Sequence, residues 1–229
     1  MITAYSTKII EKEVVAKDTL LVSFERPNTF SFKAGQHIQL AVKKLNHPDP
    51  KGSSRTFSIC SSPSNKESIS VVFRETGSGF KKTLSQLPIG KSVLVEGPLG
   101  FFSLPDLPNS HHVFVAGGIG IAPFLSMIKQ STDSGSQSNI DLVYANHDEN
   151  SAAFLEELQE LSKRSNVLSL DLIYGRVEQR HLVSYVNKKS SDLHWWVVGP
   201  PDMVTDVKYM IQSLEVWEDK IHTEEFIGY

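Results

Sequence analysis

The stretch Ala116-Gly117-Gly118-Ile119-Gly120-Ile121-Ala122-Pro123 lies between an apolar run and a helix-like segment near the middle of this 229-residue sequence. Residues 112–116 predict a strand and residues 121–130 predict a helix. A glycine-rich turn from a strand into a helix directs free backbone N–H groups toward one spot, an arrangement that binds phosphates. Such turns also serve packing in α/β folds, so the turn alone leaves both interpretations open.

After this turn, compact apolar runs alternate with helix-like segments. The apolar runs cover 112–116, 140–145, 168–174 and 195–199, and the helical patterns cover 121–130, 152–163, 180–188 and 203–214. This alternation predicts a parallel sheet with helices on both faces, a Rossmann-like α/β domain. Such sheets bind ligands at the carboxyl ends of their strands, where the glycine turn falls.

The sequence before this region has a different period. Short alternating segments at 20–24, 37–42, 69–73 and 92–96 predict strands, and residues 80–87 predict one short helix. Many short strands and little helix indicate an antiparallel barrel or sandwich. We therefore expect one domain over residues 1–105 and a second over 106–229, with the boundary at Pro105 and Pro108.

The composition indicates a packed globular protein. Hydrophobic residues make up 40% and charged residues 21%, and the net charge of −3 gives no electrostatic basis for binding nucleic acid or an anionic membrane. The N-terminus lacks the apolar core of a signal peptide, so we expect a cytoplasmic protein. Cys60 is the only cysteine and is expected to be a small buried side chain. His111 and His112 are expected to face solvent, and we predict no metal site.

The stretch Arg55-Thr56-Phe57-Ser58 lies among the predicted strands of the first half. An extended backbone places the arginine and the phenylalanine on one face and the two hydroxyl groups on the other. The Arg55 guanidinium beside the Phe57 ring suits a ligand in which a phosphate is joined to a flat ring system. Taken alone, Arg55 is better explained as a solvated surface arginine. Gly77-Ser78-Gly79, just before the short helix, is a further candidate for phosphate binding.

A second loop in the α/β half supports a ligand. Gly199-Pro200-Pro201-Asp202 follows the fourth apolar run and opens a helix, which Asp202 is expected to cap. The two prolines stiffen the exit from the strand, so the loop suits one wall of a cleft. An ordinary connection between a strand and a helix explains it equally well.

Taken in order, these stretches resemble the ferredoxin–NADP reductase superfamily over essentially the whole chain. The resemblance implies a six-stranded antiparallel flavin-binding β-barrel followed by an NAD(P)-binding α/β domain, with FAD and NAD(P)H as cofactors. The segments that carry it are Gly35-Gln36, Arg55-Thr56-Phe57-Ser58, Gly77-Ser78-Gly79 with Thr83, Gly97-Pro98-Leu99-Gly100, Gly117 to Pro123, Gly199-Pro200-Pro201 and Glu224-Glu225-Phe226.

The resemblance also implies a role for each residue. In the barrel, Arg55 and Thr56 would bind the flavin, Phe57 would pack against its ring and Ser58 would lie near flavin N5. The flavin pyrophosphate would be bound by Gly77, Ser78, Gly79 and Thr83, and NAD(P)H by Gly117, Gly118, Gly120, Pro123, Gly199 and Pro200. Glu224, Phe226 and the terminal Tyr229 would approach the flavin where the nicotinamide docks. Ser58 and Glu224 are the expected catalytic side chains for handling protons.

Two residues depart from the family pattern. Phe57 stands where the family usually has tyrosine, and Val198 stands where many members have cysteine. The choice between NADH and NADPH is left open. Asp148 and Glu149 after the second strand of the α/β half would repel a 2′-phosphate, whereas Arg176, with Arg180 nearby, would pair with it.

The main functional prediction is a monomeric flavoprotein reductase. It would take hydride from NAD(P)H onto FAD and pass electrons to a separate acceptor such as ferredoxin, flavodoxin or an oxygenase. Two alternatives remain: an NAD(P)H-dependent reductase of free flavin or quinone, and a non-enzymatic electron-transfer or sensor subunit. Tight flavin retention argues against the first alternative, and steady-state diaphorase activity argues against the second.

Overall fold

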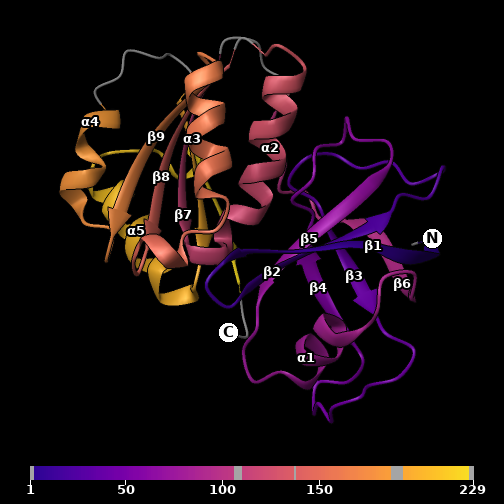
Figure 1. The fold of residues 1–229 in the computed structure, drawn as a ribbon. Coiled ribbons are helices and arrows are strands. Elements are labelled where there is room, and N and C mark those ends of the chain that lie inside the picture. Colours follow the sequence, from indigo (N-terminus) through magenta and orange to yellow (C-terminus); the bar gives the residue numbers. More distant parts are fainter. Residues whose placement is uncertain (1–2, 106–109, 137, 187–192, 227–229) are drawn as a thin grey trace. The chain divides into compact units, whose positions relative to one another are not determined.

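The computed structural model describes residues 3–105, 110–136, 138–186 and 193–226 (Figure 1). The chain divides into two compact units. One comprises Met1–Leu104 with Ala122–Gln130, and the other comprises Pro105–Ile121 with Ser131–Tyr229. The helical residues 122–130 thus group with the first unit, although the sequence pattern assigned them to the second domain. Pro108, expected at the domain boundary, lies outside the described residues.

Six strands of the first unit form an antiparallel sheet that closes on itself. The spatial order is β4-β3-β6-β1-β2-β5. A bridge between Ile59, just after β4, and Val71 of β5 joins the two edges, so the predicted antiparallel barrel is confirmed. The strands are β1 (Ala4–Ala16), β2 (Thr19–Glu25), β3 (His37–Ala41), β4 (Ser54–Ser58), β5 (Ser68–Arg74) and β6 (Ser92–Leu99).

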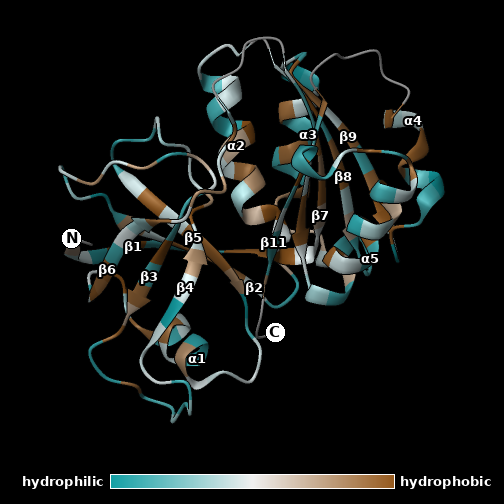
Figure 2. Cartoon of the chain, turned by 180° about the vertical axis from the view of Figure 1, so that it is seen from behind, coloured by the Kyte–Doolittle hydropathy of each residue, from teal (hydrophilic) through white to brown (hydrophobic). Residues whose placement is uncertain are grey.

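Alternation along these strands sends apolar side chains into the barrel. Phe24, Ile38 and Val95 are completely buried there, each contributing about 1.5–3 kcal/mol relative to an exposed position. The short helix α1 (Gly79–Gln86) adds Phe80 and Leu84 to the same core. Brown segments on the strands and on α1 mark this pattern in Figure 2. The core therefore fixes α1 against the barrel.

The second unit is built on a five-stranded parallel sheet of order β11-β10-β7-β8-β9. One face packs Val115, Trp195 and Val197 against Val204 and Ile211 of α5. The predicted parallel sheet is confirmed. Its strands are β7 (His111–Gly117), β8 (Asn139–Asn146), β9 (Leu168–Tyr174), β10 (Leu193–Gly199) and β11 (Ile221–Glu225). The helices that follow β7 in sequence are α2 (Ile121–Asp133), α3 (Leu155–Arg164), α4 (Val183–Val186) and α5 (Pro201–Ser213), and most of α2 groups with the first unit.

The expected elements differ from the structure at three places. Strands β1 and β11 were not expected from the sequence. The helix expected at 180–188 is divided into a 3₁₀ turn, Gln179–His181, and α4, and its residues 187–188 lie outside the described residues.

The prediction that His111 and His112 face solvent is wrong. His112 is 1% exposed, lies 2.8 Å from the Ser110 hydroxyl and accepts the Trp196 indole N–H at 3.2 Å. His111 pairs with Asp141 of β8. Strand β7 is central in the sheet, so neighbouring strands supply polar partners that the local pattern could not reveal.

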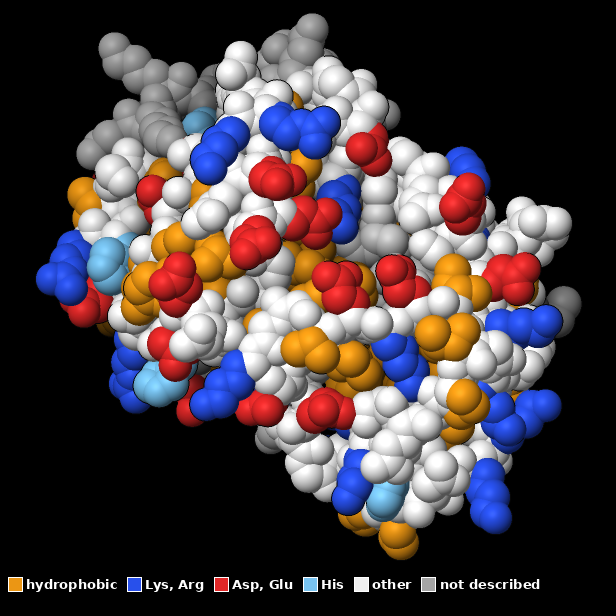
Figure 3. Space-filling view, viewed as in Figure 1, with side chains coloured by type: hydrophobic (Ala, Val, Ile, Leu, Met, Phe, Trp, Pro, Cys, Tyr) orange, Lys and Arg blue, Asp and Glu red, His pale blue; other side chains and the backbone are white. Residues whose placement is uncertain are grey.

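The surface shows no segregation of charge on the face drawn in Figure 3, where acidic and basic side chains are interspersed. Cys60 is 1% exposed, as expected for a small buried side chain. Within the described ranges, no group of His, Cys, Asp and Glu side chains could hold a metal ion. No helix in the same ranges is long and apolar enough to cross a membrane.

Candidate functional site

Arg55 is held in place by its surroundings. Its guanidinium donates hydrogen bonds to the carbonyls of residues 51, 52 and 54 at 2.9, 3.1 and 2.6 Å. It also pairs with Asp49 and lies 5.4 Å from the centre of the Phe80 ring. The Arg55 side chain is 17% exposed. It is therefore an oriented cation at the barrel surface, unlike the solvated arginine that the strand alone suggested.

The rest of strand β4 is also well fixed. Phe57 is buried in the barrel core, with its ring centre 5.7 Å from that of Phe73 and 6.1 Å from that of Phe80. The Thr56 hydroxyl donates to the Gln39 side chain at 2.8 Å. Ser58 is buried at the end of the strand.

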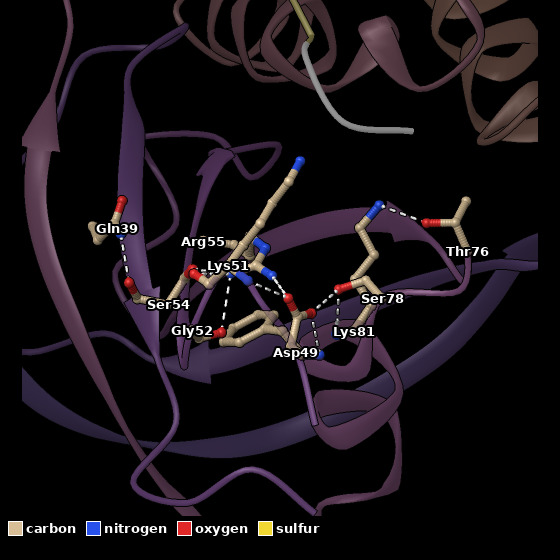
Figure 4. A network of polar contacts seen from close by, with 10 residues as sticks. Gln39, Asp49, Lys51, Gly52, Ser54, Arg55, Thr76, Ser78 and Lys81 are labelled. Carbon is tan, nitrogen blue, oxygen red and sulfur yellow. Dashed lines mark hydrogen bonds and ion pairs between the residues drawn. The ribbon is translucent and has the colours of Figure 1, made fainter. Parts of the chain in front are cut away.

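Two side chains, those of Ser78 and Asp49, accept hydrogen bonds from the backbone N–H groups in the first turn of α1 (Figure 4). Ser78 is the N-cap, and its hydroxyl oxygen accepts the Lys81 N–H at 3.3 Å. The same hydroxyl donates to Asp49 at 2.8 Å, and the Phe80 N–H donates to the same carboxylate at 2.9 Å. The Phe80 N–H and the Ser78 hydroxyl hold the pKa of Asp49 well below its usual range. The sequence pattern missed Asp49, because it lies in an irregular loop far from α1 in sequence.

Gly79 and Thr83 fix the loop of residues 46–52 on α1. A Cβ at Gly79 would lie 2.2 Å from the Pro48 carbonyl oxygen, so only glycine permits this approach. The completely buried Thr83 hydroxyl accepts the N–H groups of Asn46 and His47 at 3.1 and 3.2 Å. A Cβ at Gly77, by contrast, would meet no atom within 4 Å.

Two lysines accompany Arg55, and neither was singled out in the sequence. In Figure 4 the Lys51 and Lys81 side chains extend to the same side of the network. Lys81 is 8% exposed, and its ammonium group lies 3.4 Å from the Thr76 hydroxyl. Burial lowers its pKa, and the charges of Arg55 and Lys51 lower it further. Three cations gathered beside a helix N-terminus fit an anionic diphosphate.

Packing requires glycines in the turn after β7, whether or not a ligand binds there. Residues Gly118–Gly120 form a 3₁₀ turn, and among its glycines only Gly118 has a positive φ, of 52°. A Cβ at Gly117 would lie 2.2 Å from the Met203 sulfur, and one at Gly120 would lie 2.4 Å from the Val198 carbonyl oxygen. Pro123 lies in the first turn of α2, as expected.

The second loop lies beside this turn. Val198 pairs with Ala116 in the parallel register, and a Cβ at Gly199 would lie 3.4 Å from Gly117 Cα. The two predicted nucleotide-binding loops thus meet at the carboxyl edge of the sheet. Asp202 is not the N-cap of α5; that position is Pro200, and the helix starts at Pro201 without a side-chain cap.

Asn146 is a further polar residue at this edge, at the end of β8. Its side chain is buried, and both its amide nitrogen and its oxygen are without a hydrogen-bond partner among the described residues. A buried group left unsatisfied costs about 1–3 kcal/mol. The sequence pattern did not single out Asn146, because it follows directly on an apolar strand.

The remaining candidates lie in the second unit. Glu224 pairs with Val198 in the register of β10 and β11, and burial raises its pKa to about 7. The Phe226 N–H donates to the Gly199 carbonyl at 2.9 Å. Tyr229 lies outside the described residues.

The residues proposed to select the nucleotide lie at the ends of β8 and β9. Arg176 is exposed just after β9, and Arg180 pairs with Glu178 at 3.1 Å. The Asp148 carboxylate accepts the Ser151 N–H at 2.9 Å and caps a 3₁₀ turn. Asp148 therefore has a structural role apart from any repulsion of a 2′-phosphate.

Two family models match this chain. Residues 6–104 match the oxidoreductase FAD-binding domain model, and residues 114–209 match the oxidoreductase NAD-binding domain model. An NADH-cytochrome b5 reductase 1 of Pyricularia oryzae is 24% identical over 226 residues, covering 89% of this chain and 72% of the relative. This chain spans 55% to 72% of the length of the first three curated relatives.

Solved structures are similar over nearly the whole chain. Phthalate dioxygenase reductase matches with a TM-score of 0.80 and 26% identity, covering 97% of this chain and 68% of that chain. Ferredoxin-NADP+ reductase from Plasmodium falciparum matches with a TM-score of 0.82 and 20% identity, covering 97% and 96%. The barrel matches the FAD-binding model and the parallel sheet matches the NAD-binding model, so the chain combines the FAD-binding and NAD-binding domains of an oxidoreductase. The chain belongs to the ferredoxin–NADP reductase-like superfamily.

Proposed function

We propose that this chain is the reductase of an electron-transfer pair, taking electrons from NAD(P)H and delivering them to a separate protein acceptor. The observation that carries the proposal is the presence, in one chain, of an FAD-binding domain and an NAD-binding domain. The similar proteins are named for different acceptors: a cytochrome b5, a dioxygenase system and ferredoxin. A ferredoxin, a flavodoxin or an oxygenase component is the proposed acceptor class.

In this proposal the barrel residues bind and orient the flavin. When bound, FAD supplies the chemistry of accepting hydride and releasing single electrons. Arg55, Lys51 and Lys81 bind its diphosphate, and Phe57 supports the ring from the core. The Ser58 hydroxyl donates or accepts a hydrogen bond at the reactive edge of the ring.

The residues of the second unit bind NAD(P)H at the carboxyl edge of the parallel sheet. The turn at Gly118 and the loop at Pro200 bind the pyrophosphate and the ribose, and Asn146 supplies an amide for a polar group of the nucleotide. Glu224 holds or releases a proton, since a carboxyl with a pKa of about 7 changes protonation near neutral pH. Arg176 pairs with a 2′-phosphate if NADPH is the substrate.

Anaerobic mixing of the purified, FAD-loaded protein with NADH or NADPH tests this function. We expect bleaching of flavin absorbance with one nucleotide well ahead of the other, followed by reoxidation on adding an oxidised one-electron acceptor such as ferredoxin. Arg176→Gln should slow bleaching by NADPH more than bleaching by NADH. Failure of the protein to bind FAD, or of either nucleotide to bleach it, would refute the proposal.

A further inference from the structure

The Asp49 carboxylate lies at the centre of the polar network in Figure 4. It accepts hydrogen bonds from the backbone N–H of Phe80 at 2.9 Å, from the Ser78 hydroxyl at 2.8 Å and from the backbone N–H of Lys51 at 2.9 Å. Its fourth partner is the Arg55 guanidinium. The Asp49 side chain is 3% exposed, whereas that of Arg55 is 17% exposed. The carboxylate is therefore enclosed, and the guanidinium remains accessible.

The charges around Asp49 match those of a diphosphate. Arg55, Lys51 and Lys81 carry like charges and repel one another. Burial lowers the pKa of Lys81, and the charges of Arg55 and Lys51 lower it further. With the single Asp49 carboxylate, these side chains leave two formal positive charges. The diphosphate of FAD carries two negative charges. Asp49 thus offsets the repulsion among the cations while leaving a charge equal and opposite to that of the ligand.

We propose that Asp49 is a positioning residue for the flavin diphosphate, an inference that rests on the proposed function. It holds Arg55 and the first turn of α1 in their binding arrangement before the flavin arrives. Preorganisation of this kind strengthens binding, because the ligand does not have to order the side chains that contact it. The alternative role, a carboxylate that competes with the phosphates for the same donors, requires an enclosed side chain to give up four partners when flavin binds.

The loop that carries Asp49 does not depend on its carboxylate. Thr83 accepts the N–H groups of Asn46 and His47, and Gly79 allows the backbone of Pro48 to approach α1 closely. Arg55 is further fixed by three backbone carbonyls. Asparagine at position 49 therefore removes the negative charge and one of the two acceptor oxygens, while the loop keeps its other anchors.

The test is the affinity of the full-length apoprotein for two flavins, measured by flavin fluorescence. FAD carries the diphosphate, and riboflavin has the same ring without any phosphate. Asp49→Asn is compared with wild type and with Glu13→Gln, which removes the same charge from an exposed position of β1. We expect Asp49→Asn to weaken FAD binding by about tenfold or more, to change riboflavin binding by less than about twofold, and Glu13→Gln to change neither.

Three outcomes overturn the proposal. Tighter FAD binding by Asp49→Asn would make Asp49 a competitor of the phosphates. Equal weakening of both flavins would make its role generally structural, and an unchanged FAD affinity would leave it without any role in binding. If Asp49→Asn does not fold, Asp49→Ser, which keeps an acceptor for the Phe80 N–H, replaces it in the same comparison. Absence of FAD binding by the wild type is a separate result, because it refutes the proposed function itself.

Discussion

The half-buried carboxyl of Glu224 makes the stability of the protein depend on pH near neutrality. Burial beside β10 raises its pKa from 4.5 to about 7, so the folded state favours the neutral acid. A group whose pKa is higher in the folded state stabilises the fold fully below its unfolded pKa. That contribution is lost as the pH rises through the folded value. The stabilisation contributed by Glu224 is therefore lost between about pH 4.5 and pH 7.

The size of the effect follows from the two pKa values. The interval between 4.5 and about 7, at about 1.4 kcal/mol for each pH unit, corresponds to a loss of about 3.5 kcal/mol in the free energy of unfolding. Glu224→Gln keeps a neutral side chain of the same shape at every pH. The variant should therefore lack this loss and should be more stable than wild type above about pH 7.

Urea unfolding at several pH values, followed by tryptophan fluorescence, measures this loss. Trp195 and Trp196 are buried in the neighbouring strand and report on the same sheet. The matched control is Glu225→Gln, since Glu225 is exposed and adjacent; it should follow the wild-type pH dependence. NMR titration of the Glu224 side-chain carbon gives the pKa directly. A value near 4.5, or equal pH slopes for wild type and Glu224→Gln, would show that burial does not stabilise the neutral acid.

Three further substitutions test other parts of the structure. Thr83→Val leaves two loop N–H groups without their acceptor and should cost about 1–2 kcal/mol of stability, whereas Thr83→Ser should not; equal melting temperatures for the two would contradict this. Gly120→Ala places a Cβ 2.4 Å from the Val198 carbonyl oxygen and should cost about 1–3 kcal/mol. Gly77→Ala, which meets no atom within 4 Å, is its control in the same urea unfolding experiment. Ser58→Ala should slow flavin reduction by NAD(P)H in stopped-flow absorbance, and Ser58→Thr should keep more of the rate; an unchanged rate in Ser58→Ala removes the hydroxyl from the mechanism.

The fold could be predicted where local pattern and burial agree. The apolar runs of β7, β8 and β10 are buried over nearly their whole length, so an apolar sequence identified them directly. Strand β1 was missed, because charged and exposed residues interrupt its alternation and its place is set by pairing with both β2 and β6. Strand β11 was missed for a related reason. It is a short edge strand of mostly polar residues, held by its register with β10.

The candidate site could be predicted only in part, and the division has a physical cause. The strand spacing made Arg55 and Phe57 candidates together, and the ordered set of stretches that resembles the family made Arg55 a predicted flavin-binding residue. Asp49 and Lys51 were not recognised, because an irregular loop has no period from which to place a side chain. Their contacts with Ser78 and Arg55 exist only once the loop packs on α1. Position in the fold, rather than residue type, made these side chains part of the site.

Packing alone requires glycine at one position in each candidate site. Gly79 and Gly120 are each required because another backbone approaches within the space of a Cβ, and this requirement holds whether or not a phosphate binds. A glycine-rich turn before a helix is therefore weak evidence for a ligand, even in a protein whose family binds two nucleotides. Two polar groups that are costly to bury point more strongly to ligands. They are the buried Lys81 ammonium, whose pKa is lowered by burial and then by the charges of Arg55 and Lys51, and the buried Asn146 amide, which has no partner among the described residues. Packing does not explain these features, because apolar side chains would pack as well without the cost of burying charge or an unsatisfied amide.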